Sequence, residues 1–418
     1  MLTMACQGLG KQELIQAMFA ESRGTEDAKK ENCDDDSSEM IIGISALLNC
    51  IKEDPASVTL KHAYKMFVDV NHKPKNSYLT RLKVLYHAAE IEEVDLSIEN
   101  REKEFEKINH WAHSVGSKQL GDILTKRTVG NKIIFVVPMY FMGNWVHPFS
   151  PAFTHEAQFF INEKEAVEVP MMKSRLLKNL LYVSINKLSC RALVLPYKGE
   201  RLALVIFLPN RKGGLPIIES GLESLSPTQY FQDMHKFRRK LASDSRFQVY
   251  LPRLRIDCTI DLESPLKEMG VETIFQNGKA DFSGLVHISP KELSITQILQ
   301  KVVIDINETG NAKFPSHFEN MPDELESNKA LGCGDDPGPE IIEFRVDHSF
   351  YFQIVDIKSD LIVFGGSCKN PLQGKELGFK EFLEKYDIAV PPKKLSSNEE
   401  SIEIPPHVLN NTSKKLEV

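Results

Sequence analysis

Continuous apolar runs in the middle of the chain predict strands that are covered on both faces. The longest is Ile133–Phe141, which shows no alternation of apolar and polar residues. Two further runs, Arg191–Tyr197 and Arg201–Leu208, flank the turn residues 198–200 and predict a hairpin. Shorter strands are predicted at Phe247–Leu251, Val302–Ile306, Phe350–Asp356 and Leu361–Phe364, the last two as a second hairpin.

Helical spacing of apolar residues dominates the first third. Met40–Ile51 is apolar nearly all round, which predicts a buried helix. Tyr78–Ala89 and Ser97–Val115 carry apolar residues at three- and four-residue intervals, as expected of helices with one buried face. Asp261–Met269 predicts a short helix that ends at Gly270.

Three segments lack such patterns. Residues 21–38 are polar and predict a flexible loop. Residues 311–340 contain several prolines and glycines, and a loop of this length inside a compact domain usually signals function or disorder. Residues 372–418 predict a flexible C-terminal tail that includes a helix near Glu376–Tyr386.

Composition bounds the class of protein. The chain has 418 residues, of which 42% are hydrophobic, and a net charge of −7, which argues against nucleic acid or an anionic membrane as the main partner. No apolar run approaches the roughly 18–20 residues that span a bilayer. The N-terminus does not resemble a signal peptide, so the chain as given predicts a cytoplasmic protein. Its seven cysteines, with no close-spaced pair, favour free thiols.

Motifs for catalysis are lacking from the sequence. We find no nucleophile elbow, zinc-protease motif or glycine-rich phosphate loop. The sequence therefore predicts no enzyme, no catalytic residues, no metal and no cofactor. The basic run His235–Lys240 is compatible with weak binding of a polyanion, although a solvated edge is the simpler interpretation.

Several stretches, in order along the chain, resemble motifs of the serpin family of serine protease inhibitors. They are Tyr140–Phe149, Val167–Met172, Leu195–Gly199, Leu251–Ile256, Ala280–Gly284, Asp305–Gly310 and Phe364–Pro371. The resemblance implies an α+β serpin fold with a large five-stranded sheet, two smaller sheets and eight or nine helices. It implies a serpin domain over 1–371 with a reactive-centre loop at 311–340, and it suggests a monomer. Because Leu2–Gly10 resembles the second helix of the family, we expect the first helix to be missing. A shortened N-terminus would leave an extracellular location open.

The resemblance also implies a mechanism. A protease cleaves the exposed loop and is held as an acyl-enzyme while the loop inserts into the large sheet as a new central strand. The protease supplies the catalytic groups. The hinge of that loop corresponds to the run Glu308, Thr309, Gly310, Asn311, Ala312, Lys313, Phe314 and Pro315.

The hinge departs from the small residues that family inhibitors carry there. An inserted strand would bury Lys313, which costs several kcal/mol without a partner. Pro315 has no N–H for a central ladder. Many serpins also carry Asn and His where this chain has Val137 and Gln300. The sequence therefore predicts poor insertion and a non-inhibitory protein that acts by binding.

Two alternatives stay open at this point. One is a functional suicide-substrate inhibitor of a serine protease, with the scissile bond at Glu324–Leu325 or at Lys329–Ala330. The other is a truncated product that folds poorly. Both the non-inhibitory binder and the inhibitor would bind their partner, a serine protease or another protein ligand, through the loop.

Overall fold

The structure is a computed structural model that describes residues 1–18, 58–86, 89–116, 120–125, 132–222, 227–238, 245–287, 293–310, 341–359 and 361–373. The chain divides into a unit over Met1–Leu377 and a second over Gly378–Val418, and only the first contains described residues. The predicted loops at 21–38 and 311–340 and the predicted helix Met40–Ile51 lie outside the described residues, as does the predicted tail beyond residue 373. The predicted boundary after residue 371 stays a prediction.

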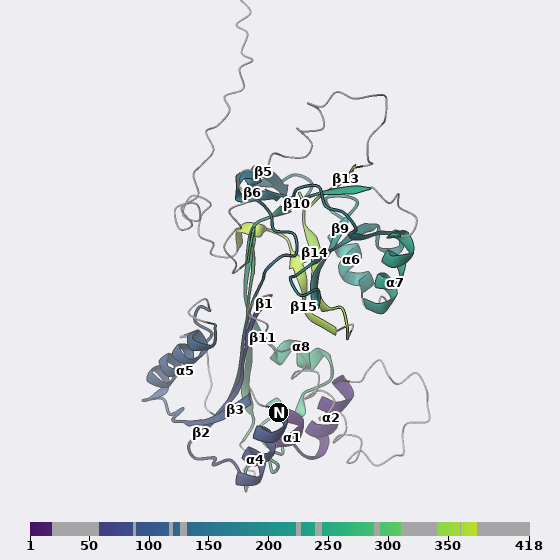
Figure 1. Cartoon of the computed structure of the whole chain (residues 1–418). Helices are drawn as coiled ribbons and strands as arrows, with labels where there is room; N and C mark the ends of the chain where they lie inside the picture. Colours follow the sequence, from purple (N-terminus) through teal and green to yellow (C-terminus); the bar gives the residue numbers. More distant parts are fainter. Residues whose placement is uncertain are drawn as a thin grey trace, which may run out of the picture. The chain divides into compact units, whose positions relative to one another are not determined.

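Figure 1 shows how the helices and strands are arranged. The large sheet contains six strands, five of which follow one another across its breadth. Its order is β11 (Leu254–Asp261), β12 (Ile295–Ile306), β4 (Ile133–Gly143), β2 (Tyr64–Asp69) and β3 (Ala89–Val94), with β1 (Val58–His62) also paired to β4. Strands β1 and β2 share one antiparallel register on β4, since His62 pairs with Met139 and Lys65 with Val136. They therefore form one line of chain that is interrupted at Ala63.

Two smaller sheets complete the β structure. One has the order β13 (Ile341–Arg345), β10 (Arg246–Pro252), β6 (Ala166–Lys173) and β5 (His155–Phe160). The other has the order β15 (Leu361–Cys368), β14 (Phe350–Asp356), β9 (Leu202–Pro209), β8 (Cys190–Pro196) and β7 (Leu181–Ile185). The pairs β8–β9 and β14–β15 are antiparallel neighbours in the second sheet, which confirms both predicted hairpins.

Seven α-helices fall within the described part of the chain. They are α1 (Leu2–Ala5), α2 (Gly8–Met18), α4 (Asn76–Leu85), α5 (Arg101–Val115), α6 (Leu215–Gly221), α7 (Pro227–Arg238) and α8 (Glu263–Glu268). Single 3-10 turns occur at η3 (Pro151–Phe153), η4 (Asn186–Leu188), η6 (Thr273–Phe275) and η8 (Pro371–Gln373).

Several predicted element boundaries were wrong. Helix α8 spans Glu263–Glu268 rather than Asp261–Met269, because Asp261 still pairs in β11. Helix α4 ends at Leu85 rather than Ala89, because the Tyr86 amide closes its last turn on Leu82 and Ala89 already pairs in the large sheet. Helix α5 begins at Arg101, because Ser97 lies in the preceding turn. Strand β12 is longer than predicted and begins at Ile295.

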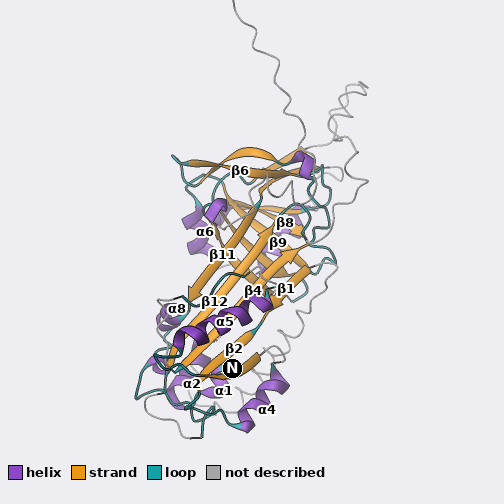
Figure 2. Ribbon diagram, turned by 90° about the vertical axis from the view of Figure 1, so that its left-hand side faces the viewer, coloured by secondary structure: helices purple, strands orange, loops and turns teal. Residues whose placement is uncertain are grey.

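The two faces of the large sheet are covered by different layers. Helix α5 lies across one face (Figure 2). There, Phe105 and Ile108 pack with Phe67 and Leu299 from the strands. The opposite face packs against the smaller sheets at one end and against α1 and α2 at the other. The C-terminal end of β12 therefore lies where the large sheet meets the smaller ones.

The described residues contain free thiols but neither a cluster of metal-ligating side chains nor a membrane-spanning helix. The four cysteines among them are free thiols, in agreement with the sequence. No group of metal-ligating side chains occurs in the ranges given above. None of the described helices is long and apolar enough to cross a membrane.

Candidate functional site

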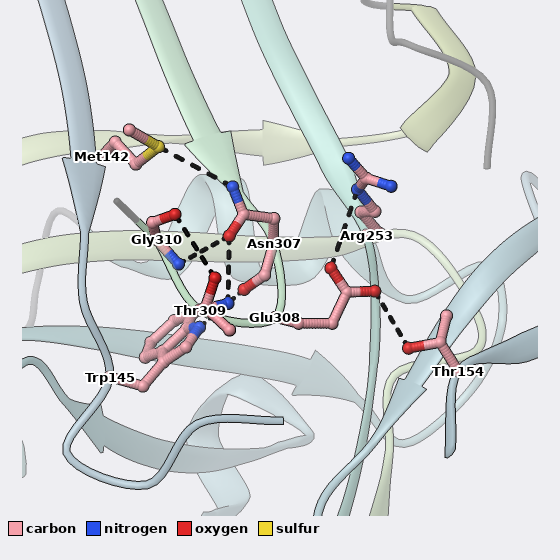
Figure 3. Close-up of polar contacts among 8 residues, drawn as sticks. All are labelled: Met142, Trp145, Thr154, Arg253, Asn307, Glu308, Thr309 and Gly310. Atoms are coloured by element: carbon pink, nitrogen blue, oxygen red, sulfur yellow. Dashed lines mark hydrogen bonds and ion pairs between the residues drawn. The ribbon is translucent and has the colours of Figure 1, made fainter. Parts of the chain in front are cut away.

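The chain leaves the large sheet through a tight turn directly after β12. The side-chain oxygen of Asn307 accepts hydrogen bonds from the backbone amides of Thr309, at 3.1 Å, and Gly310, at 2.6 Å. The Asn307 side-chain amide contacts the sulfur of Met142 on β4, at 3.7 Å. The indole N–H of Trp145 donates to the Asn307 carbonyl, at 2.7 Å. We call Asn307–Gly310 the hinge anchor, and Figure 3 shows these contacts.

Gly310 ends the hinge anchor in a conformation that only glycine adopts easily. Its φ is +68°, in the left-handed region that side chains disfavour. A Cβ at this position would overlap the carbonyl oxygen of Gly143 and the side-chain oxygen of Asn144. The structure therefore requires glycine here both for its backbone angle and for close approach to the end of β4.

Glu308 points inward from the hinge anchor and is fully buried. The Thr154 hydroxyl donates to one of its carboxylate oxygens, at 2.9 Å, and the Nε of Arg253 lies 3.9 Å from the other (Figure 3). The Glu308 carbonyl accepts a hydrogen bond from the Phe149 amide, at 3.0 Å. Burial raises the pKa of the Glu308 carboxyl, and Arg253 and Thr154 offset only part of that effect. Glu308 thus connects the loop origin to Arg253, between β10 and β11, and to Thr154, at the end of η3.

Aromatic residues pack around the hinge anchor. The rings of Trp145 and Tyr197 stack with centroids 4.6 Å apart, and Trp145 meets the Phe149 ring edge-on at 5.9 Å. Gly143 permits this arrangement, because a Cβ there would overlap the Tyr197 ring. The stack holds the Trp145 indole in place for its hydrogen bond to Asn307.

The sheet is closed at the place where an inserted strand would have to lie. Strands β12 and β4 pair directly in parallel from Ile295 and Ile133 to Asp305 and Met142. We call this pair the central seam. Val137 and Gln300, which the sequence associated with sheet opening, are register partners across it. Val137 is buried, and the Gln300 side-chain amide contacts the sulfur of Met139, at 3.4 Å.

The structure describes three of the predicted hinge residues, Glu308, Thr309 and Gly310, and brings them together in the hinge anchor. The other predicted residues, Asn311–Pro315, Glu324, Leu325, Lys329 and Ala330, lie outside the described residues. His235 of the basic run is exposed near the end of α7. The roles of Arg253 and Thr154 were missed, because their contact with Glu308 depends on tertiary packing. Trp145 is buried, and its indole N–H also bonds the hinge anchor.

Comparison with known proteins identifies the family. The family model described as "Serpin (serine protease inhibitor)" matches residues 1–371. Human Serpin B3 is 27% identical over 329 residues, covering 78% of each chain. The leukocyte elastase inhibitor of Bos taurus is 29% identical over 335 residues, covering 79% of this chain and 82% of its own.

Solved structures share the fold. Human thyroxine-binding globulin, crystallised with thyroxine, superposes with a TM-score of 0.69 at 21% identity, covering 88% of both chains. Serpin48 of the insect Tenebrio molitor gives 0.67 at 24% identity, again covering 88% of both chains. The family consists of protease inhibitors rather than enzymes, and it implies serine proteases as targets. On the family match over residues 1–371, this chain belongs to the serpin family.

Proposed function

We propose that this serpin does not trap proteases by loop insertion and instead acts by binding a protein ligand through residues 311–340. The proposal rests on the mismatch between the central seam, where β12 and β4 pair directly, and the hinge sequence that would have to enter it. A new strand would separate β12 from β4 and face the core at the level of Val137 and Gln300. It would need small or apolar side chains on that face and a backbone N–H at each step.

The hinge sequence does not meet these needs in either orientation. One orientation buries Lys313, and an unpaired ammonium in the core costs several kcal/mol or loses its proton. Pro315 has no backbone N–H, so it removes one hydrogen-bond donor from the strand ladder in either orientation. The other orientation buries Phe314 and Phe318, which are too bulky for a closely packed core. Insertion is therefore unfavourable, which supports a binding role for residues 311–340.

The test is a thermal melt before and after loop cleavage. A nonspecific protease nicks the loop within residues 311–340, and circular dichroism follows unfolding. We expect no change in Tm for the natural sequence, because the cleaved loop stays outside the sheet. A variant with Lys313→Ala, Phe314→Ala and Pro315→Ala serves as the matched comparison, and we expect its Tm to rise after the same cleavage. A large rise for the natural sequence would overturn the proposal.

A suicide-substrate inhibitor is the second candidate, favoured by family membership. It requires a covalent complex with a protease that cleaves at Glu324–Leu325 or Lys329–Ala330. Incubation with trypsin-, chymotrypsin-, elastase- and Glu-specific enzymes, followed by denaturing gel electrophoresis, reveals such a complex. A band at the summed mass of the two proteins would favour this candidate, whereas cleavage without that band supports the binding role.

A further inference from the structure

A large apolar cavity lies beneath the large sheet, on the face opposite α5. Its volume is about 360 Å³, within the range of sites that bind small molecules. Residues of α1, α2 and α8 form one wall, and the ends of β2, β3, β4 and β12 form the other. In Figure 1, α1, α2, α8, β2 and β3 lie in the lower part of the drawing.

The chemistry of the wall restricts the ligand class. Eleven of the fourteen lining residues are Met, Leu, Ile, Ala or Phe, and none is Asp, Glu, Lys or Arg. The polar side chains are those of Thr3, Tyr64 and Tyr86. Within the described part of the chain, the two tyrosine hydroxyls make no hydrogen bond. Burial raises the pKa of both tyrosines, so their hydroxyls stay protonated and able to donate.

Several apolar side chains around the cavity are only partly buried. On α8, Leu266 lines the cavity and packs against the core but is not fully buried. At the ends of α2 and α8, Met18 is 45% exposed and Met269 is 56% exposed. Apolar surface is more stable in contact with apolar groups than with water, so an occupant with an apolar body gains by covering these side chains.

The two tyrosine side chains in the lining favour a group that accepts hydrogen bonds. A carboxylate beside Tyr64 or Tyr86 would accept a hydrogen bond from a tyrosine hydroxyl. These features complement a molecule with a long apolar body and one acidic head.

We propose that the cavity binds a long-chain fatty acid, with the acyl chain between α2, α8 and the sheet and the carboxylate near Tyr64 and Tyr86. The cavity also touches the central seam, because Phe135 and Ile298 are register partners across it and both line the wall. A bound acyl chain contacts both strands of the seam, so it stabilises the closed sheet and raises the Tm.

Binding is measured with the delipidated full chain and cis-parinaric acid, a fluorescent long-chain fatty acid. We expect saturable binding and a Tm that rises with the fatty-acid concentration. Ala17→Phe places a ring in the cavity and should weaken binding at least tenfold. Gln16→Phe adds the same ring on the exposed side of α2, outside the lining, and should leave binding unchanged. Circular dichroism establishes that each variant is folded, and Leu266→Trp fills the cavity from α8 if Ala17→Phe does not fold.

The head-group assignment has its own measurement. Tyr64→Phe and Tyr86→Phe each remove one hydroxyl and should weaken binding of the acid about two- to tenfold, the range for one hydrogen bond. The methyl ester, which lacks the negative charge, should bind more weakly than the acid. Absence of saturable binding, or equal affinity of Ala17→Phe and Gln16→Phe, would overturn the proposal. The cavity does not involve residues 311–340, so these outcomes are independent of the loop experiment.

Discussion

Replacing Arg253 by methionine tests the electrostatic role of the hinge anchor. The substitution keeps an unbranched apolar side chain but removes the cation 3.9 Å from the Glu308 carboxylate. Glu308 is fully buried, and burial already raises its pKa. Without Arg253 the carboxylate either remains charged and unpaired or takes up a proton.

The proton uptake sets an upper limit on the loss of stability. From an ordinary pKa of 4.5, protonation at pH 7.5 costs about 4 kcal/mol, at about 1.4 kcal/mol per pH unit. The Coulomb energy of the pair, about 4 kcal/mol at an effective dielectric constant of 20, is of the same size. We therefore expect Arg253→Met to lower the free energy of unfolding by up to about 4 kcal/mol at pH 7.5. At pH 5.5 this upper limit falls to about 1.4 kcal/mol.

Urea unfolding midpoints at the two pH values provide the measurement. Adding Glu308→Gln to Arg253→Met removes the buried charge while an amide oxygen still accepts from Thr154, so most of the lost stability should return. Lys369→Met is the matched control, because its ion pair with Glu219 has a similar length, 3.6 Å, but Lys369 is 63% exposed. That variant should lose less than about 1 kcal/mol at either pH. An equal loss for Arg253→Met at both pH values would refute the reasoning and assign Arg253 a packing role.

Two further predictions concern backbone geometry and pH. Gly310→Ala should destabilise the fold more than Gly8→Ala. Both glycines have positive φ, but of the two only Gly310 has backbone atoms where the new methyl group would lie. Urea unfolding midpoints measure the two losses of stability, and equal losses would contradict the overlap at Gly310. Burial alone would raise the pKa of Asp356, but the hydrogen bond from Arg201 and backbone amides lower it below 3.8. The contribution of the Asp356 carboxylate to folding stability is therefore complete above pH 3.8 and is lost as the pH falls below that value. Asp356→Asn should cost about 1–3 kcal/mol at pH 7 and at pH 5 and less at pH 3.5. A difference that grows towards low pH would contradict this assignment.

The sequence predicted those parts of the fold in which burial leaves a continuous signal. Ile133–Phe141 is apolar because both faces of β4 are covered, and the two hairpins have turn residues between apolar runs. The first half of β12 was missed because Lys301 interrupts its apolar pattern. In the structure Lys301 is buried against Asp257 of β11, with 2.5 Å between the charged atoms, so a tertiary ion pair compensates for a residue that reads as solvent-exposed.

The sequence predicted where the candidate site lies along the chain but not which residues it contacts in the fold. Resemblance located Glu308 and Gly310 at the loop hinge, and the glycine fits because the turn requires it. The partners of Glu308 were not predictable, since Arg253 and Thr154 are distant in sequence and neither lies in a pattern that indicates an ion pair. Val137 and Gln300 were assigned separately to the opening region, and their direct pairing became visible only with the register of β4 and β12.

The interruption at Ala63 has a consequence for hydrogen exchange. The Ala63 amide donates to the Pro138 carbonyl, at 3.2 Å, but proline has no N–H to return the bond. The ladder along β4 therefore has a missing bond at its middle, with β1 on one side and β2 on the other. Each half can fray without breaking the bonds of the other, so the amides of Val58–His62 and Tyr64–Asp69 should exchange as two separate groups with different opening free energies.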